Sequence, residues 1–369
     1  MTLVGTRPEL IKMSRVIPAL DANFHHTFVH SGQNYDYELN QVFFEDLEIR
    51  KPDFFLNVAS ETVAKTIAEL LVKSDELFEK NKPDALLLYG DTNTCLAVIT
   101  AKRRKIPVFH MEAGNRCFDQ RVPEELNRKV VDHLSDINIV LTEHARRYLI
   151  SEGIKPETIF KSGSHMKEVL SYYKDKIKSS SILEELNLSN KSYFVFSIHR
   201  EENVDDPMNL KLLLDSMDLL SNEYKMDIIV STHPRTKKRL ESQMMFSEVS
   251  SKIKFLKPFG FFDYINLQKN SFCVLSDSGT ITEESSILNF PAVTVRNMHE
   301  RPEGMDIGTL IMSGLKPEEI LSSVRIAVST FNESISNLVS DYNVDNVSNM
   351  IVKLVQSYTG YVNRVVWKK

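Results

Sequence analysis

Five charged side chains crowd into one short stretch of this sequence, and their types suit proton transfer beside a bound anion. They are Glu112, Glu124, Glu125, Arg116 and Arg128. Carboxylates held close together have their pKa values pushed apart, so one can act as a base while another acts as an acid. The stretch follows the apolar run 106–109, which is typical of a strand. A stretch with this many charged side chains is unsuited to a hydrophobic core. We therefore predict a proton-transfer site at the end of a strand.

A second segment, 5–9, predicts a helix start with affinity for anions. Thr6 and Glu9 have the spacing of a capping box, and a proline lies in the first turn. Arg7 stands at this helix N-terminus and Lys12 follows one turn later, an arrangement that favours phosphate. The alternative is an ordinary capped helix that binds nothing.

Asp91 lies in the segment 90–94, directly after an apolar run that ends at Tyr89. Ligands of open α/β sheets bind at the carboxyl ends of the strands, so Asp91 is a candidate for contact with substrate. It could equally be the N-cap of the next helix and nothing more.

Two histidines follow strand-like runs in the second half of the chain, each with an arginine nearby. His199 precedes Arg200, and His233 precedes Arg235 by two residues. Histidine titrates near neutral pH, so His199 beside Arg200 could bind a diphosphate and protonate a leaving phosphate. The alternative is a surface histidine without a function, and the repeat of the pairing at His233 argues against it.

The segment 276–280 follows another apolar run and predicts a second helix start with a capping box. Backbone N–H groups and the hydroxyls of Ser278 and Thr280 could hold phosphate oxygens. Glu284, one turn into the helix, could accept hydrogen bonds from ribose hydroxyls. A capped helix without a ligand is the alternative. Arg301, in a later charged loop, could help to hold the same site or could belong to a solvated loop.

These motifs need sheets whose strands end at one edge, and the sequence has the pattern for two of them. Short apolar runs alternate with helical periodicity, which predicts parallel strands in doubly wound α/β sheets. After a short first strand near Leu3, the predicted strands are 27–30, 85–89, 107–109, 137–141, 193–198, 227–231, 253–256, 271–275 and 292–295. The predicted helices include 9–17, 63–80 and 124–134.

The strand pattern restarts after Gly163, which predicts two domains. The first would comprise residues 1–164 with a C-terminal helix within 344–369, and the second residues 165–343. The tail supports this return, because 344–358 has helical periodicity with an apolar face. Two Rossmann-like domains facing a cleft usually hold a ligand between their strand ends.

The composition excludes several classes of protein. With 369 residues, of which 42% are hydrophobic and 26% charged, the chain is typical of a two-domain globular protein. A net charge of -5 argues against nucleic-acid binding. No apolar run reaches the roughly 18 residues of a membrane span, and three cysteines without paired spacing favour the reducing cytoplasm. Because the chain opens almost at once on Leu3, we expect no leader and a few native residues ahead of Met1.

Cofactor motifs are absent from the sequence. No G-x-G-x-x-G follows a strand, no G-x-x-x-x-G-K-[ST] occurs, and no histidine or cysteine cluster has metal-ligand spacing. We therefore expect neither a metal nor a cofactor. The capacity to bind phosphate without a redox cofactor favours a nucleotide-linked substrate in which the chemistry takes place.

Taken in order, these motifs resemble those of the non-hydrolysing UDP-N-acetylglucosamine 2-epimerase family. The motifs are 5–9 with Lys12, 90–92, 110–116, 123–128, 199–201, 276–279 and 300–303. Each is weak to moderate alone, whereas all seven in order cover nearly the whole chain. The resemblance implies a GT-B type fold of two Rossmann-like domains, UDP bound mainly by the second domain, and a C-terminal helix that returns to the first.

The resemblance also implies a reaction on a UDP-N-acetyl-sugar. A base removes the C2 proton while UDP leaves C1, and the resulting 2-acetamidoglycal regains UDP as a proton returns to the other face. Proton transfer would fall to Asp91, Glu112 and Glu124, and which of them abstracts the proton stays open. His199 would assist the departing diphosphate. The substrate and UDP would be held by Arg7, Lys12, Arg116, Arg128, His233, Ser278, Gly279, Glu284 and Arg301.

Some residues depart from the commoner branch of this family. After Gln33 the usual Gly-Gln-His-Arg-like run is lost, which calls into question the allosteric activation by UDP-N-acetylglucosamine that this run supports. With Asn115 and the segments 117–121, 198–204 and 361–367, the chain resembles instead the branch that makes UDP-N-acetyl-L-fucosamine. That branch starts from UDP-2-acetamido-2,6-dideoxy-L-talose and serves capsule or O-antigen synthesis. A 6-deoxy sugar carries a methyl at C5, which suits a more apolar pocket.

Other functions stay open from the sequence. They are a UDP-N-acetylglucosamine enzyme giving UDP-N-acetylmannosamine, a hydrolysing epimerase, a GT-B glycosyltransferase and a nucleotide-sugar sensor. A glycosyltransferase with a lipid acceptor more often has a membrane-facing patch, and none stands out in the sequence. A sensor would not need a set of proton-transfer residues. The resemblance suggests a homodimer, without a nucleic-acid or membrane partner.

Overall fold

The computed structural model describes residues 1–32, 44–242, 250–335 and 337–369. The prediction about the run after Gln33 lies outside these residues. The chain divides into two compact units: Met1–Ser171 with Asp341–Lys369 form unit 1, and Tyr172–Ser340 form unit 2. The domain limits proposed from the sequence lie near these positions and stay a prediction.

Unit 1 contains a parallel sheet whose strand order reverses in the middle. Among the described residues the order is β3-β2-β1-β4-β5-β6-β7, and each pairing is parallel. The strands are β1 Thr2–Val4, β2 Phe28–His30, β3 Phe54–Phe55, β4 Leu86–Tyr89, β5 Val108–Ala113, β6 Ile137–Val140 and β7 Ile159–Lys161. The predicted strands of this unit are confirmed, and β3 and β7 are additional. The reversal between β1 and β4 makes the loops after these two strands the switch point, where open α/β sheets bind ligands.

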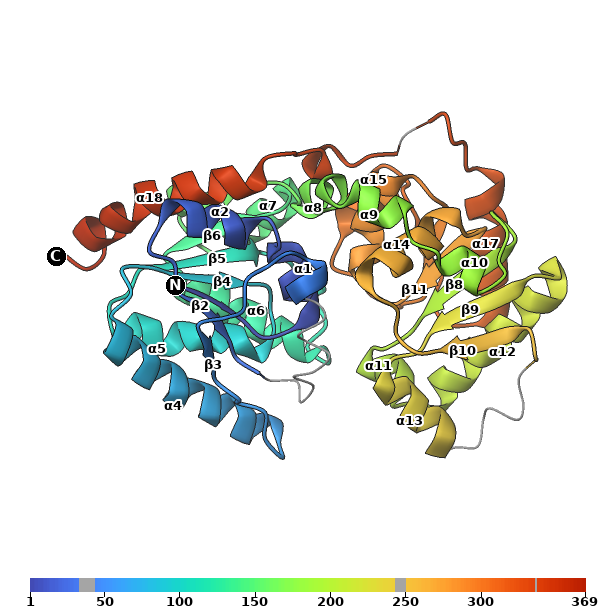
Figure 1. Ribbon diagram of the computed structural model, residues 1–369, viewed down its shortest axis with the longest axis horizontal. Helices are drawn as coiled ribbons and strands as arrows, with labels where there is room; N and C mark the ends of the chain where they lie inside the picture. The colour runs from blue at the N-terminus through green and yellow to red at the C-terminus, as the bar shows by residue number, and fades with distance from the viewer. Residues whose placement is uncertain (33–43, 243–249, 336) are drawn as a thin grey trace. The chain divides into compact units, whose positions relative to one another are not determined.

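Helices cover both faces of this sheet, with α2, α7 and α18 on one side and α4 and α5 on the other (Figure 1). The helices are α1 Arg7–Met13, α2 Val16–Asn23, α4 Val63–Asn81, α5 Val98–Arg103, α6 Pro123–Leu134, α7 Glu143–Ser151, α8 Met166–Tyr172 and α18 Val347–Val365, with short 3-10 turns η1 Asn93–Ala97 and η2 Pro156–Thr158. The predicted helices 63–80 and 124–134 are confirmed. The predicted helix 9–17 is wrong in extent, because α1 ends at Met13 and a turn at Ser14 and Arg15 separates it from α2.

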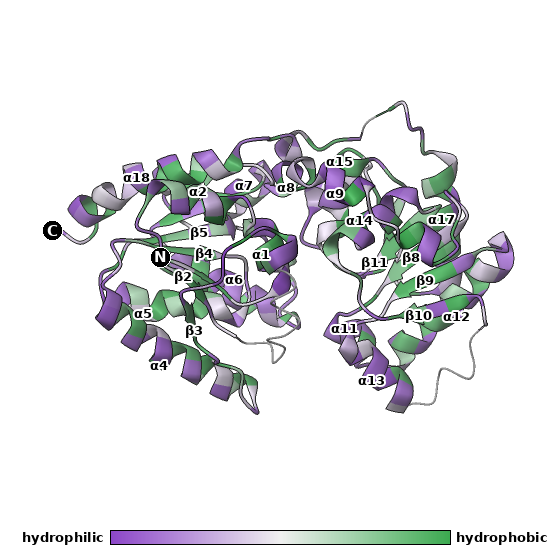
Figure 2. Ribbon diagram, in the orientation of Figure 1, coloured by the Kyte–Doolittle hydropathy of each residue, from purple (hydrophilic) through white to green (hydrophobic). Residues whose placement is uncertain are grey.

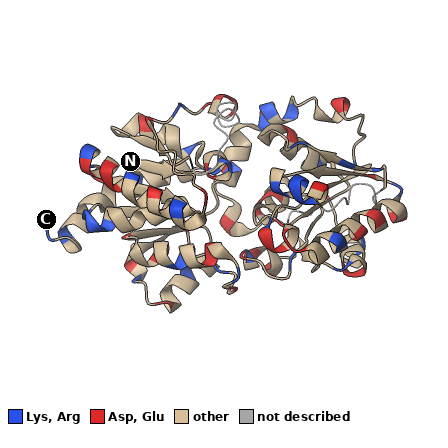
Figure 3. Cartoon of the chain, turned by 90° about the horizontal axis from the view of Figure 1, so that it is seen from below, with Lys and Arg blue, Asp and Glu red and all other residues tan. Residues whose placement is uncertain are grey.

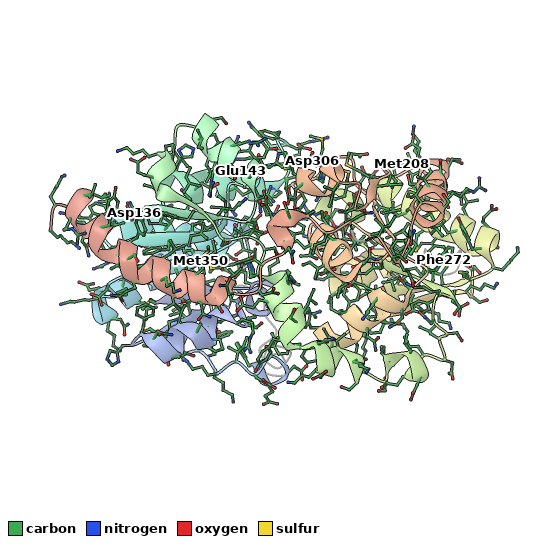
Figure 4. The ribbon with its side chains drawn as sticks, turned by 90° about the horizontal axis from the view of Figure 1, so that it is seen from above. Asp136, Glu143, Met208, Phe272, Asp306 and Met350 are labelled. Carbon is green, nitrogen blue, oxygen red and sulfur yellow. The ribbon has the colours of Figure 1, made fainter. Side chains whose placement is uncertain are left out.

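The C-terminal helix α18 packs against α2, and Figure 1 shows the two helices side by side, α18 in red and α2 in blue. Val347 and Ile351 of α18 are buried. Met350, labelled in Figure 4, is half-buried on the same helix. The helix predicted in the tail is confirmed, and it completes unit 1 with residues from the far end of the chain.

Unit 2 repeats the same plan with its own parallel sheet. Within the described residues the order is β10-β9-β8-β11-β12-β13, again with parallel pairings. The strands are β8 Tyr193–Ser197, β9 Asp227–Ser231, β10 Ile253–Leu256, β11 Cys273–Ser276, β12 Ala292–Thr294 and β13 Ile311–Met312. The predicted strands are confirmed, and β13 is additional. The order reverses between β8 and β11, which makes the loops after these strands the switch point of unit 2.

Helices flank the second sheet as they flank the first. They are α9 Lys174–Lys178, α10 Ile182–Glu185, α11 Glu201–Val204, α12 Pro207–Tyr224, α13 Pro234–Ser242, α14 Phe261–Asn270, α15 Thr280–Leu288, α16 Pro302–Asp306 and α17 Pro317–Ser329, with a 3-10 turn η4 Ser340–Tyr342 at the return to unit 1. The strands are apolar while the helices alternate between apolar and polar residues (Figure 2). Phe272, labelled in Figure 4, precedes β11 and packs edge-on against the buried Phe194 of β8, with ring centroids 5.3 Å apart. Because the strands are buried on both faces, the polar groups of each unit lie at the ends of its strands.

The surface of each unit carries charges of both signs. Figure 3 shows basic and acidic residues interspersed over the outer helices, with mostly neutral strands inside. Interspersed charge of this kind is typical of a solvated surface. Within the described part of the chain, none of the helices combines the length and hydropathy required to cross a membrane.

Candidate active site

In unit 1 the loop after β4 turns sharply and then presents Asp91. Gly90 adopts a left-handed φ of 76°, and its N–H donates to the Met111 carbonyl at 3.0 Å. The Asp91 Oδ2 accepts a 2.8 Å hydrogen bond from Nε of Arg128 in α6. The Asp91 side chain is 30% exposed. An arginine therefore orients this carboxylate while leaving it accessible.

Glu112 lies on the neighbouring strand β5 in a strained backbone conformation. Its φ is 63°, which is uncommon for a residue with a side chain, and the pairing of β5 with β6 shifts register between Met111 and Ala113. Lys12 Nζ lies 3.1 Å from Glu112 Oε2, and Asn115 Nδ2 donates to Oε1 at 3.3 Å. Backbone strain that the surroundings hold in place clusters at functional sites. The bulge therefore aims the Glu112 carboxylate at this strand end.

Asp91 and Glu112 come together because they follow paired residues of adjacent strands. Tyr89 of β4 pairs with Met111 of β5, and the two carboxylates follow within two residues. Each has its own cation, Arg128 for Asp91 and Lys12 for Glu112. A side chain of opposite charge therefore orients each of the two carboxylates.

Glu125, at the start of α6, fixes the loop that precedes this helix. Its buried carboxylate accepts hydrogen bonds from the backbone N–H groups of Cys117 and Phe118 at 3.1 and 3.2 Å. Its Oε2 also lies 3.0 Å from Nη1 of Arg128, the arginine that binds Asp91. Glu125 therefore has a structural role: through Arg128 it connects the loop around Phe118 to the Asp91 carboxylate.

The other predicted residues of unit 1 differ in exposure. Arg7, the first residue of α1, and Glu124, in the first turn of α6, are both half-buried. Arg116 is fully buried, and its guanidinium lies 2.7 Å from Asp132 Oδ2 and 2.7 Å from Glu152 Oε2. The structure thus places Arg7 and Glu124 where a ligand could reach them, and Arg116 inside an ion-pair network.

Glu9 joins two loops of this edge. Its Oε2 accepts hydrogen bonds from the Gly5 and Thr6 N–H groups at 2.5 and 3.3 Å, as the predicted capping box requires. Its Oε1 accepts a hydrogen bond from the Thr92 hydroxyl at 2.7 Å. Burial raises the pKa of Glu9 to about 7, against the opposing effect of these hydrogen bonds. A group that titrates near neutral pH therefore links the loop after β1 to the loop that carries Asp91.

In unit 2 a buried carboxylate, Asp277, joins the loops after β8 and β11. It accepts hydrogen bonds from the backbone N–H groups of His199 and Arg200, both at 3.0 Å, and its Oδ1 lies 2.9 Å from His199 Nδ1. Burial alone would raise the pKa of Asp277, but the charge and hydrogen bond of His199, together with hydrogen bonds from Arg200 and Asn203, outweigh it and lower the pKa to about 2. The His199 side chain is 40% exposed. His233 is also exposed, and the centroids of the two imidazole rings lie 6.2 Å apart. The structure therefore brings the two predicted histidines together.

Gly279 lies against an ion-pair network in the predicted phosphate segment. A Cβ at this position would lie 3.0 Å from Glu300 Oε1. Glu300 in turn bridges Arg200 and Arg296, at 2.7 and 2.6 Å. Ser278 precedes Gly279, and its hydroxyl lies 3.0 Å from that of Thr280. The segment combines hydroxyls, a residue without a side chain and a nearby arginine, which together suit a phosphate.

The carboxylates of α15 are held by neighbours within unit 2. Glu283 pairs with the buried Arg301 at 3.3 Å, and Glu284 accepts a 2.7 Å hydrogen bond from Gln268 Nε2. The capping box predicted for this helix is wrong, because its cap residue is Gly279 and Glu283 turns to Arg301 instead. Arg301 therefore holds the helix that carries Glu284.

Several residues at these two edges were not predicted to be site residues. They are Glu9, Asp132, Asp277 and Glu300. Asp277 did have a signal, since it directly follows a strand as Asp91 does. Asp132 had none, because it lies late in α6 and its partners come from β5 and the following loop. Among the described residues, no cluster of three or more His, Cys, Asp or Glu side chains could hold a metal ion.

Two parallel sheets, each with charged and polar groups gathered at its switch point, define an α/β protein of the GT-B type. The protein-family model described as UDP-N-acetylglucosamine 2-epimerase matches residues 19–356 of this chain. A protein of that name from Methanocaldococcus jannaschii is 37% identical over 331 residues, covering 88% of this chain and 90% of its own. The chain belongs to the UDP-N-acetylglucosamine 2-epimerase family and is an isomerase.

Solved structures give the same assignment for the fold. The UDP-N-acetylglucosamine 2-epimerase from Rickettsia bellii is 58% identical, with a TM-score of 0.94 and coverage of 100% of this chain and 99% of that one. The Methanocaldococcus jannaschii UDP-GlcNAc 2-epimerase in complex with UDP-GlcNAc and UDP is 33% identical, with a TM-score of 0.90 and coverage of 96% and 98%. The predicted α/β fold of the GT-B type is therefore confirmed.

Proposed function

We propose that this chain is a non-hydrolysing UDP-sugar C2 epimerase that works by eliminating and re-adding UDP. The observation that carries the proposal is the pair Asp91 and Glu112 at the ends of adjacent strands, each beside its own cation. Inversion at C2 requires a proton to leave one face and return to the other, so two separate acid–base groups suit it. The UDP-GlcNAc and UDP bound to the Methanocaldococcus jannaschii relative support UDP as the departing group.

The proposed reaction balances without a cofactor. A carboxylate takes the C2 proton, the C–H electron pair forms the C1=C2 bond, and the C1–O bond breaks with its electron pair on UDP. In the return step the UDP oxygen attacks C1, and the double-bond electrons take a proton at the opposite face of C2. Asp91, Glu112 and Glu124 divide the two proton transfers between them, as coupled carboxylates can.

Unit 2 supplies the UDP contacts in this proposal. His199, fixed by Asp277 and partly exposed, assists the departing diphosphate, with His233 beside it. The groups proposed to hold UDP are Ser278, Gly279, Glu284 and Arg301. In unit 1, Arg7, Lys12 and Arg128 supply positive charge, while Arg116 acts by holding the loop after Glu112.

For the sugar we favour UDP-2-acetamido-2,6-dideoxy-L-talose, converted to UDP-N-acetyl-L-fucosamine. Phe118 supports this choice: its side chain is 65% exposed, and it has a left-handed φ of 57°. Its N–H is held by Glu125, which also contacts Arg128 beside Asp91. An exposed aromatic ring, on a strained backbone whose N–H is held by Glu125, suits the C5 methyl of a 6-deoxy sugar. On the family resemblance we also propose a homodimer and a place in the synthesis of capsule or O-antigen precursors.

A second candidate is UDP-N-acetylglucosamine, converted to UDP-N-acetylmannosamine. The names of the relatives favour it, including that of the Rickettsia bellii protein. The two substrates differ at C6, where one carries a methyl and the other a hydroxymethyl, as well as in their stereochemistry. The chemistry at C1 and C2 is the same for both.

The test is proton NMR in D2O with each UDP-sugar supplied separately and no other reactant. Deuterium at C2 together with the inverted product establishes the epimerase, and the sugar that reacts identifies the substrate. Phe118→Ala should lower kcat/KM for the 6-deoxy sugar about tenfold, with a much smaller loss for the hydroxymethyl sugar. Leu126→Ala, which alters another exposed apolar residue nearby, is the control. The absence of exchange with either sugar, despite UDP binding, would refute the epimerase and leave a sensor or a transferase.

A further inference from the structure

We infer that Asp132 and His110 form a positioning pair that holds the Asp91 loop and the Glu112 bulge in register. This role rests on the proposed function, because it matters only where those two carboxylates transfer protons. Neither residue reaches solvent: the side chains are 0% and 1% exposed. Their effect on a ligand therefore has to pass through the groups they bind.

His110 holds the turn that presents Asp91. It lies on β5, and its Nε2 is 2.6 Å from the carbonyl oxygen of Gly90, the residue directly before Asp91. A carbonyl oxygen can only accept, so Nε2 carries a proton and donates it. The Gly90 turn has a left-handed φ of 76°, and this hydrogen bond pins it from the inside.

Asp132 holds the other carboxylate from the opposite side. Both of its oxygens accept from the Gly114 N–H at 3.2 Å, two residues after Glu112. Gly114 has a φ of 79°, and a Cβ there would lie 2.6 Å from the Ala145 carbonyl oxygen, so its chain path leaves no room for a side chain. One buried carboxylate therefore fixes the backbone that emerges from the strained bulge.

The two residues are joined to each other and to a permanent cation. His110 Nδ1 lies 2.9 Å from Asp132 Oδ1, and Arg116 Nη1 lies 2.7 Å from Oδ2. Burial alone would raise the pKa of Asp132, but His110 and Arg116 outweigh it and lower the pKa. Asp132 therefore contacts His110 and Arg116 through different oxygens, and His110 reaches the Gly90 carbonyl through its other ring nitrogen.

The path from one loop to the other is thus short and continuous. It runs from the Gly90 carbonyl through His110 and Asp132 to the Gly114 N–H, without a gap longer than 3.2 Å. Asp91 follows Gly90 and Glu112 precedes Gly114, so a shift of either residue of the pair displaces the two carboxylates relative to each other. Because catalytic groups that move by about 1 Å can cost 100-fold in rate, the pair is placed to set turnover.

The test compares two variants of the histidine. His110→Leu fills the space but cannot donate to Gly90, whereas His110→Gln places an amide N–H near the former Nε2. We expect His110→Leu to slow deuterium incorporation at C2 by about 10- to 100-fold, with the Kd for UDP within about twofold of the wild type. His110→Gln should recover most of the rate. Amide hydrogen exchange at Gly90, Asp91 and Gly114 should be faster in His110→Leu.

Asp136→Asn is the matched control. Asp136, labelled in Figure 4, is another buried carboxylate of unit 1 and accepts a 2.9 Å hydrogen bond from the Val108 N–H, at the opposite end of β5. This variant should lower the melting temperature while leaving the C2 exchange rate of the folded protein within about twofold of the wild type. Equal rate losses in Asp136→Asn and His110→Leu, or a wild-type rate in His110→Leu, would overturn the positioning role. A wild-type protein without any turnover would refute the proposed function instead, and unchanged amide exchange at Gly90 and Gly114 in His110→Leu would then still decide against the pair.

Discussion

Each unit carries an aspartate–histidine pair at its switch point, and the two pairs differ in their access to solvent. The ring nitrogen lies 2.9 Å from the carboxylate in both. In unit 1 the His110 side chain is 1% exposed, whereas in unit 2 the His199 side chain is 40% exposed. The buried pair can act only through the protein groups it binds, while the open pair can exchange a proton with a ligand. Access, and not residue type, separates the two roles.

The buried acids at the two edges respond to their surroundings in opposite directions. Burial dominates at Glu9 in unit 1 and raises its pKa to about 7. At Asp277 in unit 2 the charge and hydrogen bond of His199, together with hydrogen bonds from Arg200 and Asn203, outweigh burial, and the pKa falls to about 2. A buried carboxyl that gains only hydrogen bonds therefore titrates near neutrality, and one that also gains the charge of a histidine stays ionised.

The largest effect expected from this comparison is on turnover. His199→Ala should lower kcat by about 100- to 10,000-fold, because an accessible acid–base group is lost. The melting temperature should also fall, because the buried Asp277 carboxylate loses the histidine that offsets its burial, so kcat is compared well below that temperature. Turnover is followed by NMR and unfolding by calorimetry. A kcat within fivefold of the wild type would remove His199 from the chemistry and leave the exposed pair as a structural element.

The next effect concerns the raised pKa of Glu9. Between pH 4.5 and 7 the unfolded chain has lost this proton while the folded chain keeps it, so stability falls as pH rises and the cost is complete above pH 7. Glu9→Gln lacks this titration, and its amide can still join Gly5, Thr6 and Thr92. In urea unfolding at pH 5 to 8, the variant should gain up to roughly 3 kcal/mol over the wild type at the high end. Parallel pH curves for the two proteins would contradict the buried, protonated Glu9.

Asp277 should show the opposite dependence on pH. Its lowered pKa contributes stability above about pH 4, and this stability is lost as pH falls through about 2. Asp277→Asn should lose about 2 kcal/mol at neutral pH and should lack the acid-dependent loss of the wild type. Acid titrations of the two proteins, followed by circular dichroism, measure this difference. If both lose stability equally between pH 4 and 2, His199 does not hold this carboxylate ionised.

The smallest expected effect is a loss of UDP affinity on substitution of Gly279 in unit 2. Gly279→Ala places a Cβ 3.0 Å from Glu300 Oε1, so Glu300 has to shift against Arg200 and Arg296. The Kd for UDP should rise several-fold, by about 1 kcal/mol, while C2 exchange at saturating substrate stays near the wild-type rate. Calorimetry measures the Kd for UDP, and NMR measures the rate of C2 exchange. A loss of exchange without a loss of UDP affinity would reverse the assignment of functions to the two units.

The sequence predicted the strands of both sheets because buried parallel strands are continuous apolar runs, such as Ile137–Val140. It missed β3, β7 and β13, which have two or three residues each and at most one buried residue, because so short a run cannot be told from a loop. It also joined α1 and α2, because the two-residue turn at Ser14 and Arg15 does not interrupt the helical periodicity.

At the site, the residues directly after strands could be found from sequence, and Asp91 and His199 are examples. The residues that hold them could not. Asp132 reaches His110 across 22 positions and Gly114 across 18 positions, and only the folded sheet sets those contacts. The bulge at Glu112 was likewise invisible, because its φ of 63° is imposed by neighbours and not by the residue type.

The return of the chain to unit 1 through α18 has a consequence for biosynthesis. All of unit 2, Tyr172–Ser340, is translated before Asp341–Lys369, which unit 1 needs for completion. A nascent chain that has emerged up to Ser340 can form the second sheet, whereas α18, the helix that packs against α2, has not yet been translated. On the ribosome the middle of this protein is therefore ready to fold before its beginning.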